Sequence, residues 1–343
     1  MTVVRCDASH AARWDAFVAR STAASFYHRF AWKAINEEMF GHRTAYLAVL
    51  ADDGGIAGVY PLVQVKSRLF GNIACSMPFV NYGGPAADAA DAERLLMEEA
   101  ARVCAEWNVD FLEIRSRHHL GDGLPASAHK VSMTLDLAPD PDTLWNAFKT
   151  GHRQEIRRGY KHGLTARVGG REMVDEFFEV LEDSWRHLGT PLYAKSYFER
   201  IADDFGKDIR ITVVYAGDRP AGAAFDGLHG KTVEGMWLGS RAEYRHWKIG
   251  YVLYWELIKE ACTAGYTRFH LGRSSVDSGG EAFKKKWNAE SMPLYWHYLL
   301  RHRKELPQVN VNNPKYELAI QVWKELPLAV IRRVGPRIAR CIP

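Results

Sequence analysis

Apolar residues recur with a helical period in two long segments of the chain. The first stripe spans 174–188 and consists of Val174, Phe177, Phe178, Leu181, Trp185 and Leu188. The second follows the i, i+3, i+4, i+7 spacing and consists of Tyr254, Leu257, Ile258 and Ala261. Because Gly189 and Gly265 close the two segments, each pattern predicts an amphipathic helix that buries one face against a neighbouring layer.

Short runs rich in β-branched residues predict an antiparallel hairpin in each half of the chain. In the first half, Thr44–Leu50 and Ile56–Val65 flank an Asp-Asp-Gly-Gly turn. In the second half, Ile209–Tyr215 and Pro220–Leu228 flank an Ala-Gly-Asp-Arg turn. Each hairpin precedes a further strand, a glycine-containing loop and an amphipathic helix, and the further strands are Asn72–Ser76 and Lys231–Leu238.

Residue spacing supports a duplication of one folding unit. Four residues of the first half recur at a constant offset in the second, inside a helix, turn and strand in both cases. They are Glu98, Cys104, Phe111 and Arg115, matched by Glu256, Cys262, Phe269 and Arg273. This order of elements is typical of an α+β sandwich. We expect two tandem domains, 1–148 and 149–304, with mixed, mostly antiparallel sheets flanked by helices, and an amphipathic tail at 305–343.

The composition of the chain argues against several classes of protein. A chain of 343 residues with 47% hydrophobic content can bury a sizeable core, and a formal charge of +4 is small for a protein that coats nucleic acid. The cysteines are odd in number and scattered without ligand spacing, so we expect reduced thiols and no metal site. The segment 1–14 lacks a signal-peptide pattern, and no run of ~18 apolar residues occurs. We expect a cytoplasmic protein with at most peripheral contact to the inner membrane.

Several motifs carry a resemblance to a known family. The strand Arg268–Ser274 is followed by Ala282–Asn288, which contains a Phe-Lys pair, and the first half contributes the loop Pro78–Gly84. The tail adds Asn313–Tyr316 and Gly335–Arg337. Together these motifs resemble the FemAB family of the GNAT acyltransferase superfamily, in particular its exosortase- and PEP-CTERM-associated branch with a BioF2-like acetyltransferase domain. The resemblance covers nearly the whole chain and implies a tandem GNAT fold that transfers an acyl or aminoacyl group to an amine.

In the GNAT superfamily, backbone N–H groups of a loop before a helix bind the pyrophosphate of the donor. The matching loop is 245–250, with Arg245, Lys248 and Gly250 as donor-binding candidates and Arg273, at a strand end, as a further phosphate ligand. Lys248 stands where the first glycine of the loop pattern belongs. The donor therefore stays open among acyl-CoA, an acyl carrier protein and aminoacyl-tRNA, and tRNA is expected only as a donor.

The same resemblance assigns the reaction centre. Lys284 of the Phe-Lys pair is expected to face the activated carbonyl, with Phe283 holding it and contacting the acceptor. Acyl transfer also needs a base for the amine, and Glu234, on the strand before the donor loop, is the first candidate. Its competitors are Asp226, Glu243 and His270. The adjacent Lys285 and Lys286 are interpreted as a solvated face.

Two groups of residues are candidates for binding the acceptor. Asn81 and Tyr82 lie in a glycine-bounded loop that suits contact with a sugar or peptide, and equally suits packing of an unused donor site in the first repeat. Arg153 and Arg157 belong to the basic segment 152–161, which suits a phosphate-bearing acceptor and equally an ordinary exposed helix. The expected acceptor is an amino-sugar or peptide precursor linked to a nucleotide or lipid diphosphate.

The sequence favours an N-acyltransferase that acts on a cell-envelope or exopolysaccharide precursor. A catalytically inactive GNAT-like module for binding or assembly in polysaccharide export is the alternative, and a tRNA-binding protein is a third reading. The tail from Lys315 onward predicts short amphipathic helices broken at Pro327 and Pro336. These helices either pack on the lobes or dock on an anionic membrane surface.

Overall fold

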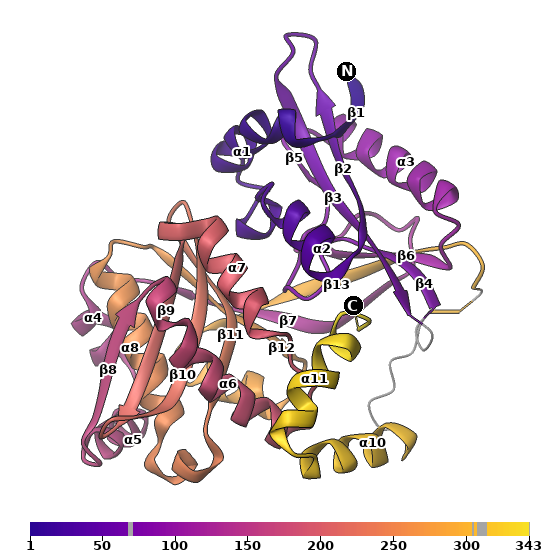
Figure 1. Cartoon of the computed structure of the whole chain (residues 1–343). Coiled ribbons are helices and arrows are strands. Elements are labelled where there is room, and N and C mark those ends of the chain that lie inside the picture. The colour runs from indigo at the N-terminus through magenta and orange to yellow at the C-terminus, as the bar shows by residue number, and fades with distance from the viewer. Residues whose placement is uncertain (68–70, 304, 307–313, 343) are drawn as a thin grey trace. The chain divides into compact units, whose positions relative to one another are not determined.

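The computed structural model describes residues 1–67, 71–303, 305–306 and 314–342, which form two compact units. Unit 1 holds Met1–Val131 and a return segment that begins at Met292. Unit 2 holds Ser132–Ser291 and two C-terminal helices. Figure 1 labels the helices and strands of both units. The bounds 1–148, 149–304 and 305–343 stay a prediction about separately folding domains.

Unit 1 has an α+β architecture. Its strands follow the order β1-β2-β3-β4-β6-β13, with β5 paired to β3, and β4 runs parallel to β6. The strands are β1 (Thr2–Cys6), β2 (Arg43–Leu50), β3 (Ile56–Ser67), β4 (Gly71–Cys75), β5 (Ala86–Ala87), β6 (Phe111–Ser116) and β13 (Glu290–Leu300). The helices are α1 (Ala11–Arg20), α2 (Trp32–Phe40) and α3 (Ala90–Glu106).

Alternating side chains of β2 give unit 1 an apolar core on each face of its sheet. Leu47 and Val49 lie in one buried cluster with Leu96 of α3. Tyr46 lies in another with Trp14 of α1. Because successive strand residues point to opposite faces, α3 and α1 cover opposite faces of the sheet. Burial of this apolar surface, at roughly 25 cal/mol per Å², is the main source of stability for the unit.

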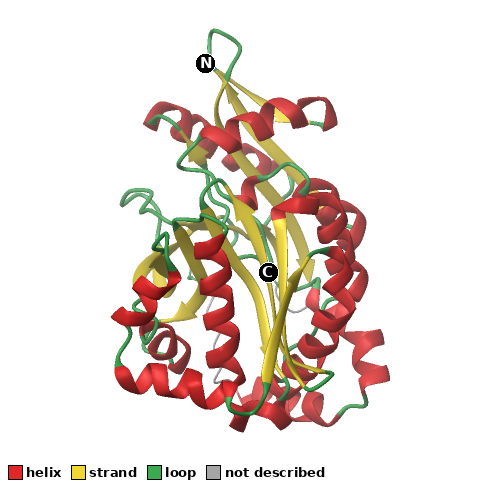
Figure 2. Ribbon diagram, turned by 90° about the vertical axis from the view of Figure 1, so that its left-hand side faces the viewer, coloured by secondary structure: helices red, strands yellow, loops and turns green. Residues whose placement is uncertain are grey.

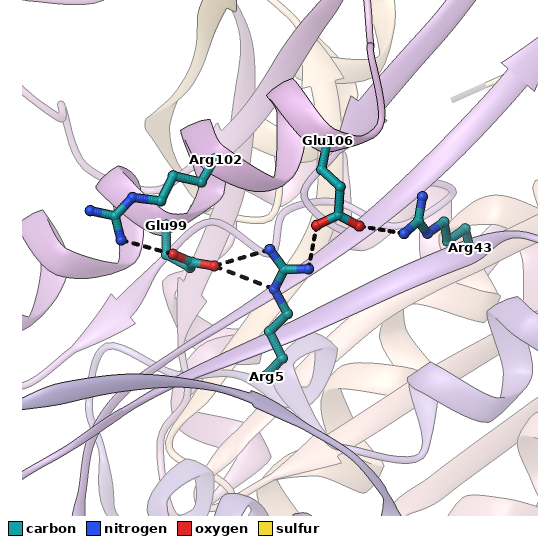
Figure 3. Close-up of polar contacts among 5 residues, drawn as sticks. All are labelled: Arg5, Arg43, Glu99, Arg102 and Glu106. Carbon is teal, nitrogen blue, oxygen red and sulfur yellow. Dashed lines mark hydrogen bonds and ion pairs between the residues drawn. The ribbon is translucent and has the colours of Figure 1, made fainter.

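A network of ion pairs joins α3 to the first two strands of unit 1, as Figure 3 shows. Arg5 of β1 contacts Glu99 at 3.1 Å and Glu106 at 2.5 Å. Arg43 of β2 contacts the other oxygen of Glu106, and Arg102 contacts Glu99. The three arginines are exposed, so each pair is expected to contribute only about 0–1 kcal/mol.

Unit 2 repeats this plan, with the strand order β7-β12-β11-β10-β9-β8. The strands are β7 (Ala126–Asp136), β8 (Leu164–Gly169), β9 (Ile209–Ala216), β10 (Arg219–His229), β11 (Thr232–Ser240) and β12 (Arg268–Ser275). The helices are α4 (Pro141–Ala147), α5 (Thr150–Tyr160), α6 (Val174–Leu188), α7 (Lys195–Phe205), α8 (Ile249–Thr263) and α9 (Gly279–Lys285). In its parallel pair Phe269 lies opposite Val233, as Phe111 lies opposite Ile73 in unit 1. The matched phenylalanines of the sequence repeat occupy equivalent positions.

Close contacts at two glycines show that helices cover both faces of the unit 2 sheet. Figure 2 shows the helices beside the strands. A Cβ atom on Gly222 of β10 would lie 2.4 Å from Ile249 of α8. A Cβ atom on Gly239 of β11 would lie 2.9 Å from Ser184 of α6. Because Gly239 pairs with Ala223, the neighbour of Gly222, α8 and α6 lie on opposite faces. The predicted α+β class with mostly antiparallel strands is confirmed.

The periodicity of apolar residues correctly predicted the long helices α6 and α8. The predicted burial of one side chain was wrong. Leu188, expected in the core, is 57% exposed. The helix α6 ends at this residue, and Gly189 takes a left-handed conformation with φ of 76°. Because the chain turns away after the last helical turn, the apolar stripe loses its final member.

The tail forms α10 (Pro314–Glu325) and α11 (Leu328–Ala339), both within unit 2. Arg332 of α11 donates hydrogen bonds of 2.6 and 2.8 Å to Glu182 of α6, which supports packing on the unit. The break at Pro327 is confirmed, whereas Pro336 lies inside α11 and does not break it. A proline at this position removes one backbone hydrogen bond, but the helix continues past it to Ala339.

Two further points concern the tail. The motif residue Asn313 lies outside the described residues. Within the described ranges, no helix combines the length and the apolar character that crossing a bilayer requires. Docking of the tail on a membrane surface stays a prediction.

Each half of the chain contributes a strand to the sheet of the other half. The strand β7, from the first half, ends in unit 2, where Asp136 pairs with Arg268 at 3.2 Å. The strand β13, from the second half, enters unit 1, where Trp296 lies opposite Arg115 of β6. The sequence analysis did not predict this exchange.

Candidate functional site

In unit 2 the regular parallel pairing of β11 and β12 covers only a short stretch. Their register ends at Glu234 and His270, while β11 continues beside β10 to its last residue. Glycines follow on both strands. A Cβ atom on Gly235 would lie 2.8 Å from the carbonyl oxygen of His270, and Gly272 has a φ of 77°. Both positions require glycine, one for close backbone approach and the other for its left-handed conformation.

Lys284 of α9 reaches the end of β12 at this point. Its Nζ donates to the carbonyl oxygens of Gly272 at 2.9 Å and Arg273 at 3.1 Å. The residue is 9% exposed, and burial, together with the nearby Arg273, lowers the pKa of Lys284 to about 8. Its partners among the described residues are backbone carbonyls rather than a carboxylate. The site therefore holds a buried amine that is mostly charged at neutral pH.

A buried carboxyl lies on the neighbouring strand. Asp226 of β10 pairs with Gly235 of β11 and is 3% exposed. Burial raises the pKa of Asp226 to about 8, against the opposing effect of Arg210. The pKa of Tyr254 on α8 is raised, first by burial of Tyr254 and second by the charge of Asp226. The ring of Tyr254 packs against that of Phe283, with ring centroids 5.4 Å apart. Asp226 therefore lies on the sheet face that α8 covers.

The loop before α8 is covered by α5. Lys248, the N-cap residue of α8, has a left-handed conformation with φ of 63°. Its Nζ forms an ion pair of 2.8 Å with Glu155 of α5. A Cβ atom on Gly159 of α5 would lie 2.4 Å from Val252 and 3.4 Å from the carbonyl oxygen of Trp247. Close packing of α5 on this loop depends on that glycine.

Comparison with known proteins identifies this arrangement. Residues 147–285, which contain all of these groups, match the acetyltransferase (GNAT) domain family. The structure of FemX is similar with a TM-score of 0.68 at 16% identity, over 94% of this chain and 100% of FemX. A tandem GNAT protein from the clavulanic acid biosynthesis pathway is similar with a TM-score of 0.51 at 11% identity, over 87% of this chain and 97% of that one. The chain has a tandem GNAT fold.

A third solved structure is also similar in fold to this chain. It is the C-terminal domain (DUF2156) of an Agrobacterium fabrum protein assigned as a lysylphosphatidylglycerol synthetase. The TM-score is 0.56 at 17% identity, over 92% of this chain and 95% of that one. No curated protein matches the sequence.

The donor-binding candidates lie at two places in the second GNAT unit. Arg245 is exposed in the loop before α8, and Gly250 lies in the first turn of that helix. Lys248 keeps the left-handed conformation that glycine adopts without cost, so the GNAT loop retains a glycine-like backbone with a lysine in that position. Arg273 lies on β12 beside Lys284. Donor binding by these residues stays a prediction.

The candidate bases occupy different surroundings. Glu234 is 1% exposed, and alternation along β11 places it on the face opposite Asp226, which pairs with the next residue. Glu243 is exposed in the loop before α8. His270 contacts the hydroxyl of Thr134 on β7 through Nδ1 at 2.8 Å. Asp226 thus combines burial with a pKa raised to about 8.

The predicted acceptor loop is buried inside unit 1. Asn81 is 8% exposed and donates to the hydroxyl of Tyr27 at 2.8 Å. Tyr82 is 2% exposed and lines a pocket of about 230 Å³, together with Arg115 and Arg117. The loop therefore packs the first GNAT unit and leaves a small pocket beside Tyr82. Acceptor contact at this loop stays a prediction.

The arginines predicted for the acceptor lie on α5 in unit 2. Arg157 is exposed, with its guanidinium 5.4 Å from the ring centroid of Trp145. Arg153 donates to the hydroxyl of Thr150 at 3.4 Å. The sequence analysis missed the contact of this helix with the donor loop, because spacing within one helix does not reveal that Glu155 binds Lys248.

Proposed function

We propose that the protein is an N-acyltransferase that transfers an acyl or aminoacyl group to an amine of a cell-envelope or exopolysaccharide precursor. The observation that carries this proposal is the buried ammonium of Lys284 at the end of β12 in a GNAT domain. A preorganised positive charge stabilises an oxyanion that develops in the transition state. Two N–H groups of Lys284 bind backbone carbonyls, which leaves the third for a substrate oxygen.

The proposed reaction is a single acyl transfer. The amine nitrogen attacks the carbonyl carbon of the donor, and the electron pair of the C=O bond moves to the oxygen beside Lys284. When the C=O bond re-forms, the donor's leaving group departs and takes up a proton, and the new amide gives its extra proton to a base. Asp226, with a pKa of about 8, and Glu234 are the candidate bases.

Aminoacyl or acyl transfer in general is supported by the comparisons. FemX has a similar fold, and the Agrobacterium fabrum structure is a domain of a putative lysylphosphatidylglycerol synthetase. The acceptor would be an amino-sugar or peptide precursor that carries a nucleotide or lipid diphosphate, as expected for the exosortase-associated branch. The donor would be acyl-CoA, an acyl carrier protein or aminoacyl-tRNA.

A catalytically inactive binding or assembly module is the second candidate. The observation that favours it is the ion pair of Lys248 with Glu155 over the donor loop, because a loop bound to α5 is less accessible to a pyrophosphate. An enzyme whose donor lacks coenzyme A also accommodates this contact. Activity measurements therefore separate the two candidates.

Replacement of Lys284 tests the proposed function. Purified protein is incubated with acyl-CoA, acyl carrier protein and charged tRNA donors and a panel of UDP-amino sugars and peptide precursors, and mass spectrometry detects amide products. For the productive pair, Lys284→Met is expected to lower kcat by about 10²-fold, because an oxyanion donor is lost. A matched control is Lys207→Met, which removes an exposed lysine outside the site and should retain the wild-type rate.

The outcomes are distinct. Product formation that depends on Lys284 supports the transferase. If no donor and acceptor pair yields product, while an acceptor raises the melting temperature of the protein, the binding module is favoured. Equal kcat values for Lys284→Met and wild type would remove Lys284 from the mechanism.

A further inference from the structure

Unit 2 contains a pocket beside α5, α8 and α9. It has a volume of about 520 Å³ and is lined by residues of α5, α8 and α9. The lining residues used below are Lys149, Gly151, His152, Tyr251, Lys285 and Lys286. None of residues 245–250 lines it, but Tyr251, which follows this loop, and Glu155, which pairs with Lys248 of the loop, both do, so the pocket adjoins the loop to which the GNAT pattern assigns the donor.

The N-terminus of α5 opens into this pocket. The helix has eleven residues, no acidic residue in its first turn and no side-chain cap. Nothing lies within 4 Å of the position that a Cβ atom on Gly151 would take. A helix N-terminus carries a partial positive charge and backbone N–H donors, and both favour an anion.

A buried histidine points independently to a ligand. His152 is 7% exposed, and neither ring nitrogen has a hydrogen-bond partner among the described residues. Its ring packs against Trp287 at 4.2 Å and Phe148 at 5.3 Å between centroids. Leaving a buried polar group unpaired costs about 1–3 kcal/mol, so a polar ligand at this wall relieves a penalty.

The charges around the pocket are predominantly positive. Lys149, Lys285 and Lys286 all line it, and Lys286 lies 3.4 Å from the hydroxyl of Tyr251. The one carboxylate of the lining, Glu155, is bound by Lys248 and Arg158. Lys285 is paired with Glu281. Lys149 and Lys286 therefore supply charge that an anion can neutralise.

We propose that this pocket binds the phosphate or diphosphate group of a small substrate, held by the N-terminus of α5, His152, Lys149 and Lys286. The phosphate belongs either to a nucleotide donor or to a nucleotide-linked acceptor. Binding is measured without turnover, so this inference stands or falls separately from the transfer reaction.

Replacement of Gly151 is the sharpest test. Its Cβ position is open, so Gly151→Asp places a carboxylate at the helix N-terminus without a clash, in a position that favours helix stability. Isothermal titration with pyrophosphate is expected to show binding to the wild-type protein and at least about tenfold weaker binding to Gly151→Asp. The matched Gly151→Asn, of similar shape but neutral, should bind within about threefold of wild type.

Lysine variants and spectroscopy complete the test. Lys149→Gln combined with Lys286→Gln should weaken pyrophosphate binding, whereas Lys161→Gln, exposed at the far end of α5, should not. Pyrophosphate should also shift the ring resonances of His152 in nuclear magnetic resonance spectra. Equal affinity of Gly151→Asp and wild type, or an unchanged His152 signal, would overturn the proposal.

Competition identifies the source of the phosphate. Displacement of pyrophosphate by coenzyme A assigns the pocket to a donor, and displacement by UDP-N-acetylglucosamine assigns it to an acceptor. If pyrophosphate binds and neither compound displaces it, or if only a short RNA binds, the assignment to a small substrate is wrong.

Discussion

At the scale of single residues, burial brings an acid and a base of unit 2 to similar pKa values. It lowers the pKa of Lys284 to about 8 and raises the pKa of Asp226 to about 8, because removal from water disfavours the charged form of both. At neutral pH Lys284 is mainly charged and Asp226 mainly protonated. Small changes in the surroundings of either side chain can therefore change its protonation state.

The raised pKa of Asp226 predicts a specific pH dependence of stability. Its folded pKa lies above the unfolded value, so its contribution is fully present below pH ~4 and is lost as pH rises towards 8. The Asp226→Asn variant should not show this loss. At pH 8 its free energy of unfolding should exceed that of the wild type by more than about 1 kcal/mol. Urea denaturation at pH 5 and pH 8 measures the difference.

A control variant tests whether the expected change in pH dependence comes from the burial of Asp226 or from the loss of any aspartate charge. Asp218→Asn, in the exposed turn before β10, should follow the wild-type pH profile. Parallel profiles for Asp226→Asn and wild type would show that Asp226 titrates normally in the folded protein.

The sequence could predict some of these residues and not others. Lys284 was selected through the Phe-Lys motif, and its burial could not be read from the sequence. Asp226 was only one of several candidate bases, because its pKa depends on strand pairing and on α8, which are tertiary features. His152 was missed as a separate candidate, since its unpaired ring is visible only when its neighbours are in place.

At the scale of elements, α11 is attached to α6 by a pair of unequal exposure. The Glu182 side chain is 4% exposed, whereas the Arg332 side chain is 62% exposed. Gly335 lies beside this contact, and a Cβ atom there would be 3.0 Å from the carbonyl oxygen of Leu192. This ion pair and this close backbone approach thus help to position α11, whose Ile331 is also buried.

Removal of the arginine is expected to loosen the tail. Arg332→Ala leaves the buried Glu182 without this partner and should cost about 1–3 kcal/mol of unfolding free energy. Guanidinium denaturation and the rate of tryptic cleavage within α11 measure the effect. Arg333→Ala, which removes the adjacent exposed arginine, should change neither by much, and equal effects of the two variants would count against the contact.

Elements with a strong period were predictable from the chain alone. The stripes of α6 and α8 and the hairpins of β2–β3 and β9–β10 were located by spacing and turn residues. Pro336 was misjudged because proline signals a helix end in general, whereas α11 continues past it to Ala339. The covering of the donor loop by α5 depends on Gly159, whose role is visible only in packing.

At the scale of the whole molecule, each compact unit requires residues from both halves of the chain. Unit 1 takes β13 from the second half, and unit 2 takes the end of β7 from the first. The internal repeat predicted two tandem folds but not this exchange, because strand pairing between distant segments leaves no local pattern. A fragment cut at the sequence boundary therefore lacks a strand.

Expression of residues 1–148 alone tests this requirement. Without β13 the edge of β6 is unpaired, so the fragment is expected to aggregate or to give poorly dispersed amide spectra. Residues 1–131 joined by a glycine-serine linker to 290–303 should fold and give dispersed spectra. A stable, monomeric 1–148 fragment would show that β13 is dispensable.

The pairing of Arg115 on β6 with Trp296 on β13 also has a consequence for folding during translation. A ribosome adds about 5–20 residues per second, so β6 emerges roughly 10–35 s before its neighbour exists. During this interval a hydrogen-bonding edge is presented to the cell, and newly made chains are most exposed to mispairing. Conditions that slow translation of the second half should increase the demand for chaperones more than conditions that slow the first.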